Sequence, residues 1–137
     1  MPVFPSGDWM TAFCDALRAH PEAVDVATAL DGVYRFVVEP WGPLQERHAY
    51  DVEIRADGGS PHVAWAPAAG DDAPNLTLTA SYQRWRQMIE GELDIGLAVM
   101  LRRVQVSGDL PRLLSQLSKT EPLREALVAV DTQWLGA

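Results

Sequence analysis

The stretch that decides the fold is LTLTASYQRWRQMIEGELDIGLAVMLRRVQVSGD, residues 76–109. It begins with alternating residues that put Leu76 and Leu78 on one side, and this period of two predicts a strand over residues 75–80. Ser81 can then cap a helix that Gly91 suits as its end. The apolar stripe of that helix comprises Tyr82, Trp85, Met88 and Ile89. The hydrophobic period therefore changes from that of a strand to that of a helix within a few residues.

Short elements of the same kind are predicted on both sides of this boundary. Downstream, an apolar helix over residues 95–101 precedes a strand over residues 103–107. Upstream, Ser6 or Asp8 can cap a helix that runs towards His20, and a second short helix ends at Asp31-Gly32. Three strands then follow, over residues 33–40, 47–55 and 62–66, the last two joined by a hairpin turn at Asp57-Gly58-Gly59.

The C-terminal region predicts two more helices. Asp109 with Pro111 is a good helix start, and the apolar face that follows consists of Leu110, Leu113, Leu114 and Leu117. Pro122 opens the last helix. No repeat or linker divides residues 1–137, so we expect a single domain. The predicted fold class is α+β, with a five-stranded, mostly antiparallel sheet covered by helices on one face.

Charge and composition narrow the range of partners. The formal net charge is −8 and Lys119 is the only lysine, which argues against a generic nucleic-acid binder and disfavours tight electrostatic docking on anionic lipid. No apolar run is long enough to span a bilayer, and residues 1–6 lack the features of a secretory signal. A lone cysteine, Cys14, cannot form an internal disulfide. We therefore expect a cytoplasmic protein with a neutral or apolar partner.

The sequence contains no arrangement of side chains that predicts catalysis. Cys14 lies on the apolar face of the first helix, which makes it a core residue. His48 and His62 could face each other across the predicted hairpin, but no histidine has the spacing of a metal ligand. Glu90, Glu92 and Asp94 read as solvated side chains or caps. We therefore expect no enzyme activity, no cofactor and no metal.

Three pieces of the chain resemble the sterol carrier protein 2 family, in that family's order. Residues 76–81 match its strand leading into a helix, and residues 85–94 match the helix that ends in a Gly-Glu-Leu element. Residues 100–109 match its signature of Met, a basic residue, an alternating strand and Gly-Asp. The order of elements agrees over nearly the whole chain. Arg102 departs from the pattern, because the family commonly has glycine there, and backbone geometry or pocket access could differ at this point.

The resemblance implies a curved sheet under several helices, with an apolar tunnel between the layers. It implies binding or carriage of a hydrophobic ligand (fatty acyl, sterol-like or isoprenoid) without catalysis. The apolar helical positions of the chain exceed what contact with a sheet would use, although such positions are more often ordinary core. The side chains expected to line the site are Phe36, Trp85, Met88, Ile89, Leu97, Met100, Val104, Leu114, Leu117 and Leu127.

Two other classes of function stay open. A small cone-shaped α+β enzyme, resembling ketosteroid isomerase, would need a buried carboxylate in its pocket. A protein interaction module without a ligand would instead use the apolar helices to dock on a partner, or on a second copy as a homodimer.

Overall fold

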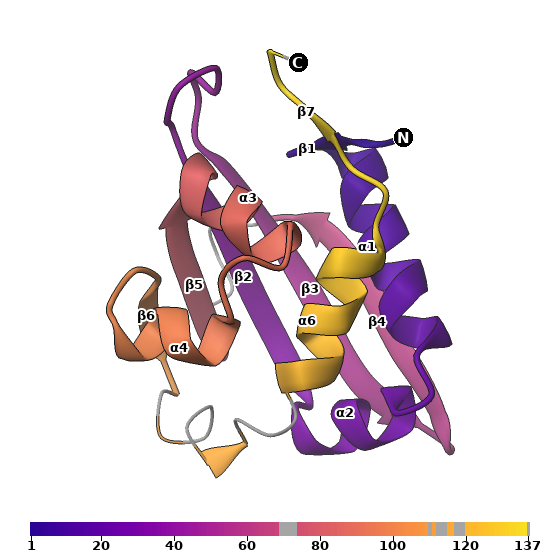
Figure 1. Ribbon diagram of the computed structural model, residues 1–137. Helices are drawn as coiled ribbons and strands as arrows, with labels where there is room; N and C mark the ends of the chain where they lie inside the picture. The colour runs from indigo at the N-terminus through magenta and orange to yellow at the C-terminus, as the bar shows by residue number, and fades with distance from the viewer. Residues whose placement is uncertain (69–73, 110, 112–114, 117–119, 137) are drawn as a thin grey trace.

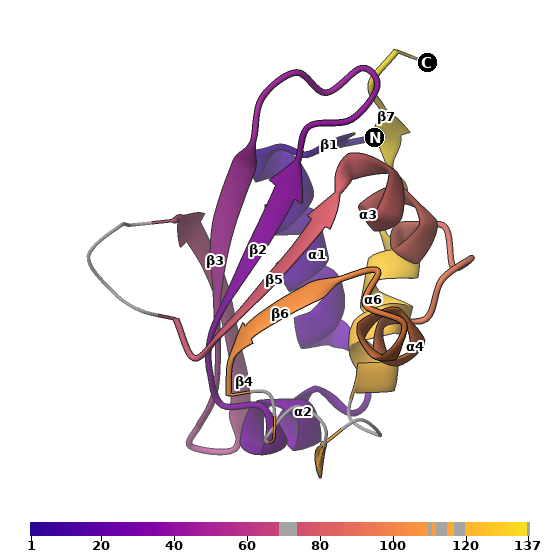
Figure 2. The ribbon, with the colours of Figure 1, turned by 90° about the vertical axis from the view of Figure 1, so that its left-hand side faces the viewer.

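The computed structural model of the chain describes residues 1–68, 74–109, 111, 115, 116 and 120–136. One sheet forms a layer, and the helices gather on one of its faces (Figures 1 and 2). In this part of the chain no helix has the length and apolar character needed to cross a membrane. The arrangement confirms the predicted α+β class.

The five strands of the sheet lie in the order β4-β3-β2-β5-β6. Their bounds are β2 Gly32–Glu39, β3 His48–Asp57, β4 Ser60–Pro67, β5 Leu76–Ser81 and β6 Gln105–Gly108. Three of the four pairings are antiparallel, as predicted, while β2 and β5 run parallel. The parallel register places Tyr34 opposite Leu76 and Phe36 opposite Leu78. Large apolar side chains from two strands therefore meet at the centre of one face.

Two of the helices begin after serines that the sequence predicts as caps, Ser6 and Ser81, whereas the last helix begins at Thr120, two residues before the predicted Pro122. Their bounds are α1 Gly7–Ala19, α2 Ala23–Ala29, α3 Tyr82–Ile89, α4 Ile95–Met100 and α6 Thr120–Ala129. The Ser6 hydroxyl accepts a hydrogen bond from the Trp9 N–H at 3.1 Å, and the Ser81 hydroxyl accepts one from the Arg84 N–H at 3.3 Å. Each hydroxyl satisfies a backbone donor that lacks a partner within its own helix.

A chain of aromatic rings ties α1 to the sheet and to α3. Trp9 stacks on Phe13 with ring centroids 5.6 Å apart, Phe13 lies 5.9 Å from Phe36, and Phe36 lies 5.3 Å from Trp85. Trp9 is fully buried and Trp85 is nearly so. This row of rings packs between the sheet and the helices.

The structure differs from the sequence-based expectations at both ends and near β6. Strands β1 (Val3–Phe4) and β7 (Gln133–Trp134) form a separate parallel pair, too short to leave a periodic pattern. Strand β6 starts later than predicted because the Arg103 N–H still bonds to the Ala98 carbonyl at 2.9 Å, so the chain wraps the end of α4 first. Most of the helix predicted after Asp109 lies outside the described residues.

Arg102 adopts the backbone that a glycine would favour. Its φ is 58°, which makes it the single residue other than glycine with a positive φ in the described ranges. A side chain in this left-handed region is sterically disfavoured, by roughly 1–2 kcal/mol. At the position where the resembling family commonly has glycine, the chain therefore carries an arginine in a strained backbone conformation.

Candidate functional site

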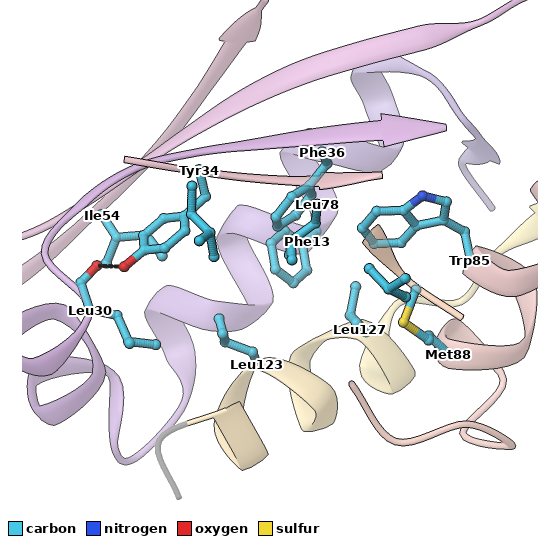
Figure 3. Close-up of a pocket in the computed structure, with 12 residues that line it drawn as sticks. Phe13, Leu30, Tyr34, Phe36, Ile54, Leu78, Trp85, Met88, Leu123 and Leu127 are labelled. Atoms are coloured by element: carbon cyan, nitrogen blue, oxygen red, sulfur yellow. Dashed lines mark hydrogen bonds between the residues drawn. The ribbon is translucent and has the colours of Figure 1, made fainter. Parts of the chain in front are cut away.

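An apolar cavity of about 40 Å³ lies between the sheet and the helices (Figure 3). Strands β2, β3 and β5 form its upper side in this view, with α1, α3 and α6 around it. The lining residues are Phe13, Leu30, Tyr34, Phe36, Ile54, Leu76, Leu78, Trp85, Met88, Val104, Leu123 and Leu127.

The polar atoms of this lining are turned to the backbone. The Tyr34 hydroxyl donates to the Leu30 carbonyl at 2.6 Å, drawn as the dashed line in Figure 3. The Trp85 indole N–H donates to the Val37 carbonyl at 2.9 Å. None of the described lining residues is an acid, a histidine or a base. This part of the lining therefore offers contact with carbon and with the Met88 sulfur, and no group for proton transfer.

The cavity is small for a ligand as it stands. A site needs roughly 10–15 Å³ of this kind of volume to admit one water, so about 40 Å³ corresponds to a few water molecules. An apolar space of this size stays dry. Typical ligand pockets span about 300–1,000 Å³. A bound lipid would require its walls to separate, and the tunnel that the resemblance implies stays a prediction.

The structure brings together half of the residues predicted to line a site. Phe36, Trp85, Met88, Val104 and Leu127 all border the cavity. Ile89 is buried beside them but is not part of the lining.

Leu97 and Met100 lie elsewhere, with 49% and 68% of their surface exposed. The expectation for these two does not hold, because α4 turns Ala98 inward, which is 0% exposed, and the opposite side of so short a helix faces out. Leu114 and Leu117 lie outside the described residues.

Sequence reasoning missed the other lining residues, which are Phe13, Leu30, Tyr34, Ile54, Leu76, Leu78 and Leu123. A signal was present for several of them. Leu76 and Leu78 alternate on one face of a strand, as do Tyr34 and Phe36, and Phe13 lies on the apolar face of its helix. Periodicity identified those faces as buried, but it does not distinguish a cavity wall from packed core.

The candidate chemical groups lie apart from one another. His48 is opposite Val38 and His62 is opposite Arg55, so the two histidines do not face each other across the hairpin, contrary to the expectation. His62 lies 3.3 Å from the Glu53 carboxylate. Among the described residues no three acidic, histidine or cysteine side chains are grouped to hold a metal ion.

Cys14 is packed in the core, with 2% of its surface exposed. Burial raises the pKa of its thiol from 9.0 to about 11, while the nearby charge of Arg18 lowers this pKa and that of Asp15 raises it, both by less. A thiol with so high a pKa is almost entirely protonated at neutral pH and is a poor nucleophile.

Several solved structures have the same arrangement of sheet and helices as this chain. A conserved hypothetical protein from Thermus thermophilus, described as a candidate sterol carrier protein, matches with a TM-score of 0.75 at 17% identity over 93% of this chain and 90% of its own. The crystal structure of sterol carrier protein 2 matches with a TM-score of 0.74 at 18% identity, over 91% and 97% of the two chains. Sterol carrier protein domain 2 of Helicoverpa armigera matches with a TM-score of 0.59 at 22% identity, over 92% and 91%.

These structures share the fold of the chain. No curated protein sequence matches it significantly. The model of the SCP-2 sterol transfer family matches residues 13–120, which include the sheet, α3, α4 and nearly all of the cavity lining. Lipid or sterol binding or transfer is the class of function that this match supports. With a family match over most of its length, the chain belongs to the SCP-2 sterol transfer family.

Proposed function

We propose that this protein is a single cytoplasmic domain that binds and carries a hydrophobic ligand (fatty acyl, sterol-like or isoprenoid) without chemically changing it. The observation that carries the proposal is the cavity between the sheet and the helices. Its described lining is apolar, and the Tyr34 hydroxyl and the Trp85 indole N–H already have backbone partners. A hydrocarbon can enter such a space without leaving a buried polar group unsatisfied.

The ligand would have to widen the cavity. The cavity of about 40 Å³ is lined by side chains from three helices and three strands. Of these elements, the helices are the ones that can move as units. Helix α6 supplies Leu123 and Leu127 and is linked to the end of α1 through a contact between polar side chains, His20 to Glu125 at 2.8 Å. The Glu125 side chain is half-exposed, so this contact is a weak restraint. We expect α6 to move away from the sheet when a ligand binds.

The geometry gives the enzyme alternative no support. An enzyme resembling ketosteroid isomerase requires a carboxylate in its pocket, and the described lining contains none. The interaction-module alternative predicts that the protein binds no lipid, because its apolar surfaces would bind another protein instead.

Titration with a fluorescent fatty acyl chain tests the proposal directly. We expect saturable binding of one chain per protein, with a negative heat-capacity change by calorimetry. Leu78→Phe, which enlarges a side chain of the lining, should weaken binding, and Val128→Phe, at an exposed position of α6, should not. Native mass spectrometry of the purified protein should detect a small hydrophobic molecule bound to it. The absence of saturable binding to acyl, sterol and isoprenoid ligands alike would overturn the proposal.

A further inference from the structure

An open groove outside the cavity collects three of the chain's ten arginines. It measures about 570 Å³ and runs beside the paired strands β5 and β6. Its lining consists of Glu39, Thr79, Ala80, Ser81, Arg84, Arg102, Arg103 and Gln105. A local concentration of positive charge is unexpected in a protein with a net charge of −8.

The positive charge of this groove is not neutralised within the described part of the chain. The one carboxylate in the described lining of the groove, on Glu39, already lies 3.2 Å from the Arg47 guanidinium. Arg102 and Arg103 are exposed, and no described carboxylate lies within ion-pair distance of either. Arg102 is also held in the left-handed backbone region, where a glycine would relieve the strain. These guanidinium groups are therefore available to an external anion.

Exposed apolar side chains directly precede these arginines. Leu97, Met100 and Leu101 expose 49%, 68% and 52% of their surfaces. Their spacing of three and four residues puts them on one face at the end of α4, which lies beside β6 at an edge of the molecule (Figures 1 and 2). The acidic side chains Glu92 and Asp94 are at the opposite end of this helix. The end of α4 thus combines apolar and cationic groups.

The same corner adjoins the cavity. Val104 lines the cavity, and it also lines a second open groove together with Arg102. Val104 is buried, so its side chain lies between the apolar cavity and the groove beside Arg102.

We propose that this corner, formed by Arg84, Leu97, Met100, Leu101, Arg102 and Arg103, docks on the surface of an anionic phospholipid bilayer. The apolar side chains would enter the boundary between headgroups and acyl chains, and the arginines would contact lipid phosphates. A soluble polyanion would account for the arginines but not for the apolar face, and an apolar protein partner would account only for the latter. The acidic remainder of the protein is repelled by the bilayer, so the interaction is weak, oriented and sensitive to salt.

Vesicle co-sedimentation tests the docking surface. We compare vesicles of phosphatidylcholine with vesicles that also contain about one third phosphatidylglycerol, and expect binding to the anionic vesicles that is lost at high salt. An arginine at such a surface contributes about fivefold, so Arg102→Gly with Arg103→Gln should reduce partitioning by about 25-fold. Arg102→Gly removes a strained side chain, so this variant should fold at least as well as the natural protein. Leu101→Ser should also weaken binding.

Arg55→Gln is the matched control, because it removes an exposed arginine from β3, away from the groove. Equal binding to neutral and anionic vesicles, an equal loss with Arg55→Gln, or no vesicle binding at all would overturn the proposal. A dimer in sedimentation velocity that the Arg102 and Arg103 changes dissolve would overturn it in favour of a second copy. Acyl binding measured without vesicles is independent of docking, so each proposal can fail while the other stands.

Discussion

The cavity predicts an unusual response to a small enlargement of Val104. Val104→Ile adds one methylene to a side chain that is 2% exposed and lines the space of about 40 Å³. Residual cavity volume costs about 24 cal/mol per Å³, so the empty space costs roughly 1 kcal/mol. Burying one methylene contributes about 0.8 kcal/mol. Because isoleucine keeps the χ1 preference of valine, we expect a stabilisation of about 0.5–1 kcal/mol and a rise in Tm of roughly 2–5 °C.

Val52→Ile is the matched control for this substitution. Val52 is fully buried on β3, between Tyr34 and Trp65 on the neighbouring strands, and does not border the cavity. The same added methylene should overpack the core there and cost about 1–3 kcal/mol. Urea unfolding of the two variants beside the natural protein measures both effects as shifts in the midpoint at constant slope. Equal destabilisation of the two variants would refute the reasoning, because it would mean that no usable space exists beside Val104.

Three further predictions concern other parts of the structure. Because burial raises the pKa of Cys14 to about 11, its stabilising effect is complete below pH 9 and should be lost between about pH 9 and 11, where the thiol of the unfolded chain ionises first. Urea unfolding at a series of pH values should show this decline, and Cys14→Ala should reduce it, with the part due to the raised pKa of Tyr50 remaining. Gly108→Ala would place a Cβ 2.4 Å from the Asn75 carbonyl oxygen, so this variant should unfold or lose more than about 3 kcal/mol of stability. Gly58→Ala has no atom within 4 Å of its new Cβ and should lose only about 1 kcal/mol, and thermal denaturation measures both changes. Tyr34→Phe removes the hydroxyl that donates to the buried Leu30 carbonyl, so urea unfolding should show a loss of about 1–3 kcal/mol of stability. The affinity for an acyl chain should be unchanged, because this hydroxyl is turned away from the cavity.

Local signals account for the elements that sequence reasoning predicted correctly. Ser81 is a helix cap because its hydroxyl reaches a backbone N–H three residues ahead, and Leu76 and Leu78 share a face because strand side chains alternate. Both effects act over a few residues, so they can be predicted from the sequence without knowing the fold. Alternation also predicted that Tyr34 and Phe36 lie on one side of their strand, and both border the cavity.

Features that depend on distant parts of the chain could not be predicted in this way. The parallel pairing of β2 with β5 is set by how the chain crosses between them, and it decides which residues share the cavity. Met100 follows the helical apolar pattern, yet a helix of six residues has room to bury little more than Ala98. The groove that holds Arg84, Arg102 and Arg103 is formed by three separate segments of the chain, so the net charge of the whole sequence did not predict this local positive charge.

The pairing of β1 with β7 has a consequence for how the protein is made. Phe4 is synthesised 130 residues before Trp134, the residue opposite it in the parallel pair. At roughly 5–20 residues per second, translation separates the two by about 6–26 s. During that interval the Phe4 ring, which is only 3% exposed in the folded protein, lacks the partner strand that helps to cover it. Until Trp134 is synthesised, the Phe4 ring therefore stays more accessible to solvent than it is in the folded protein.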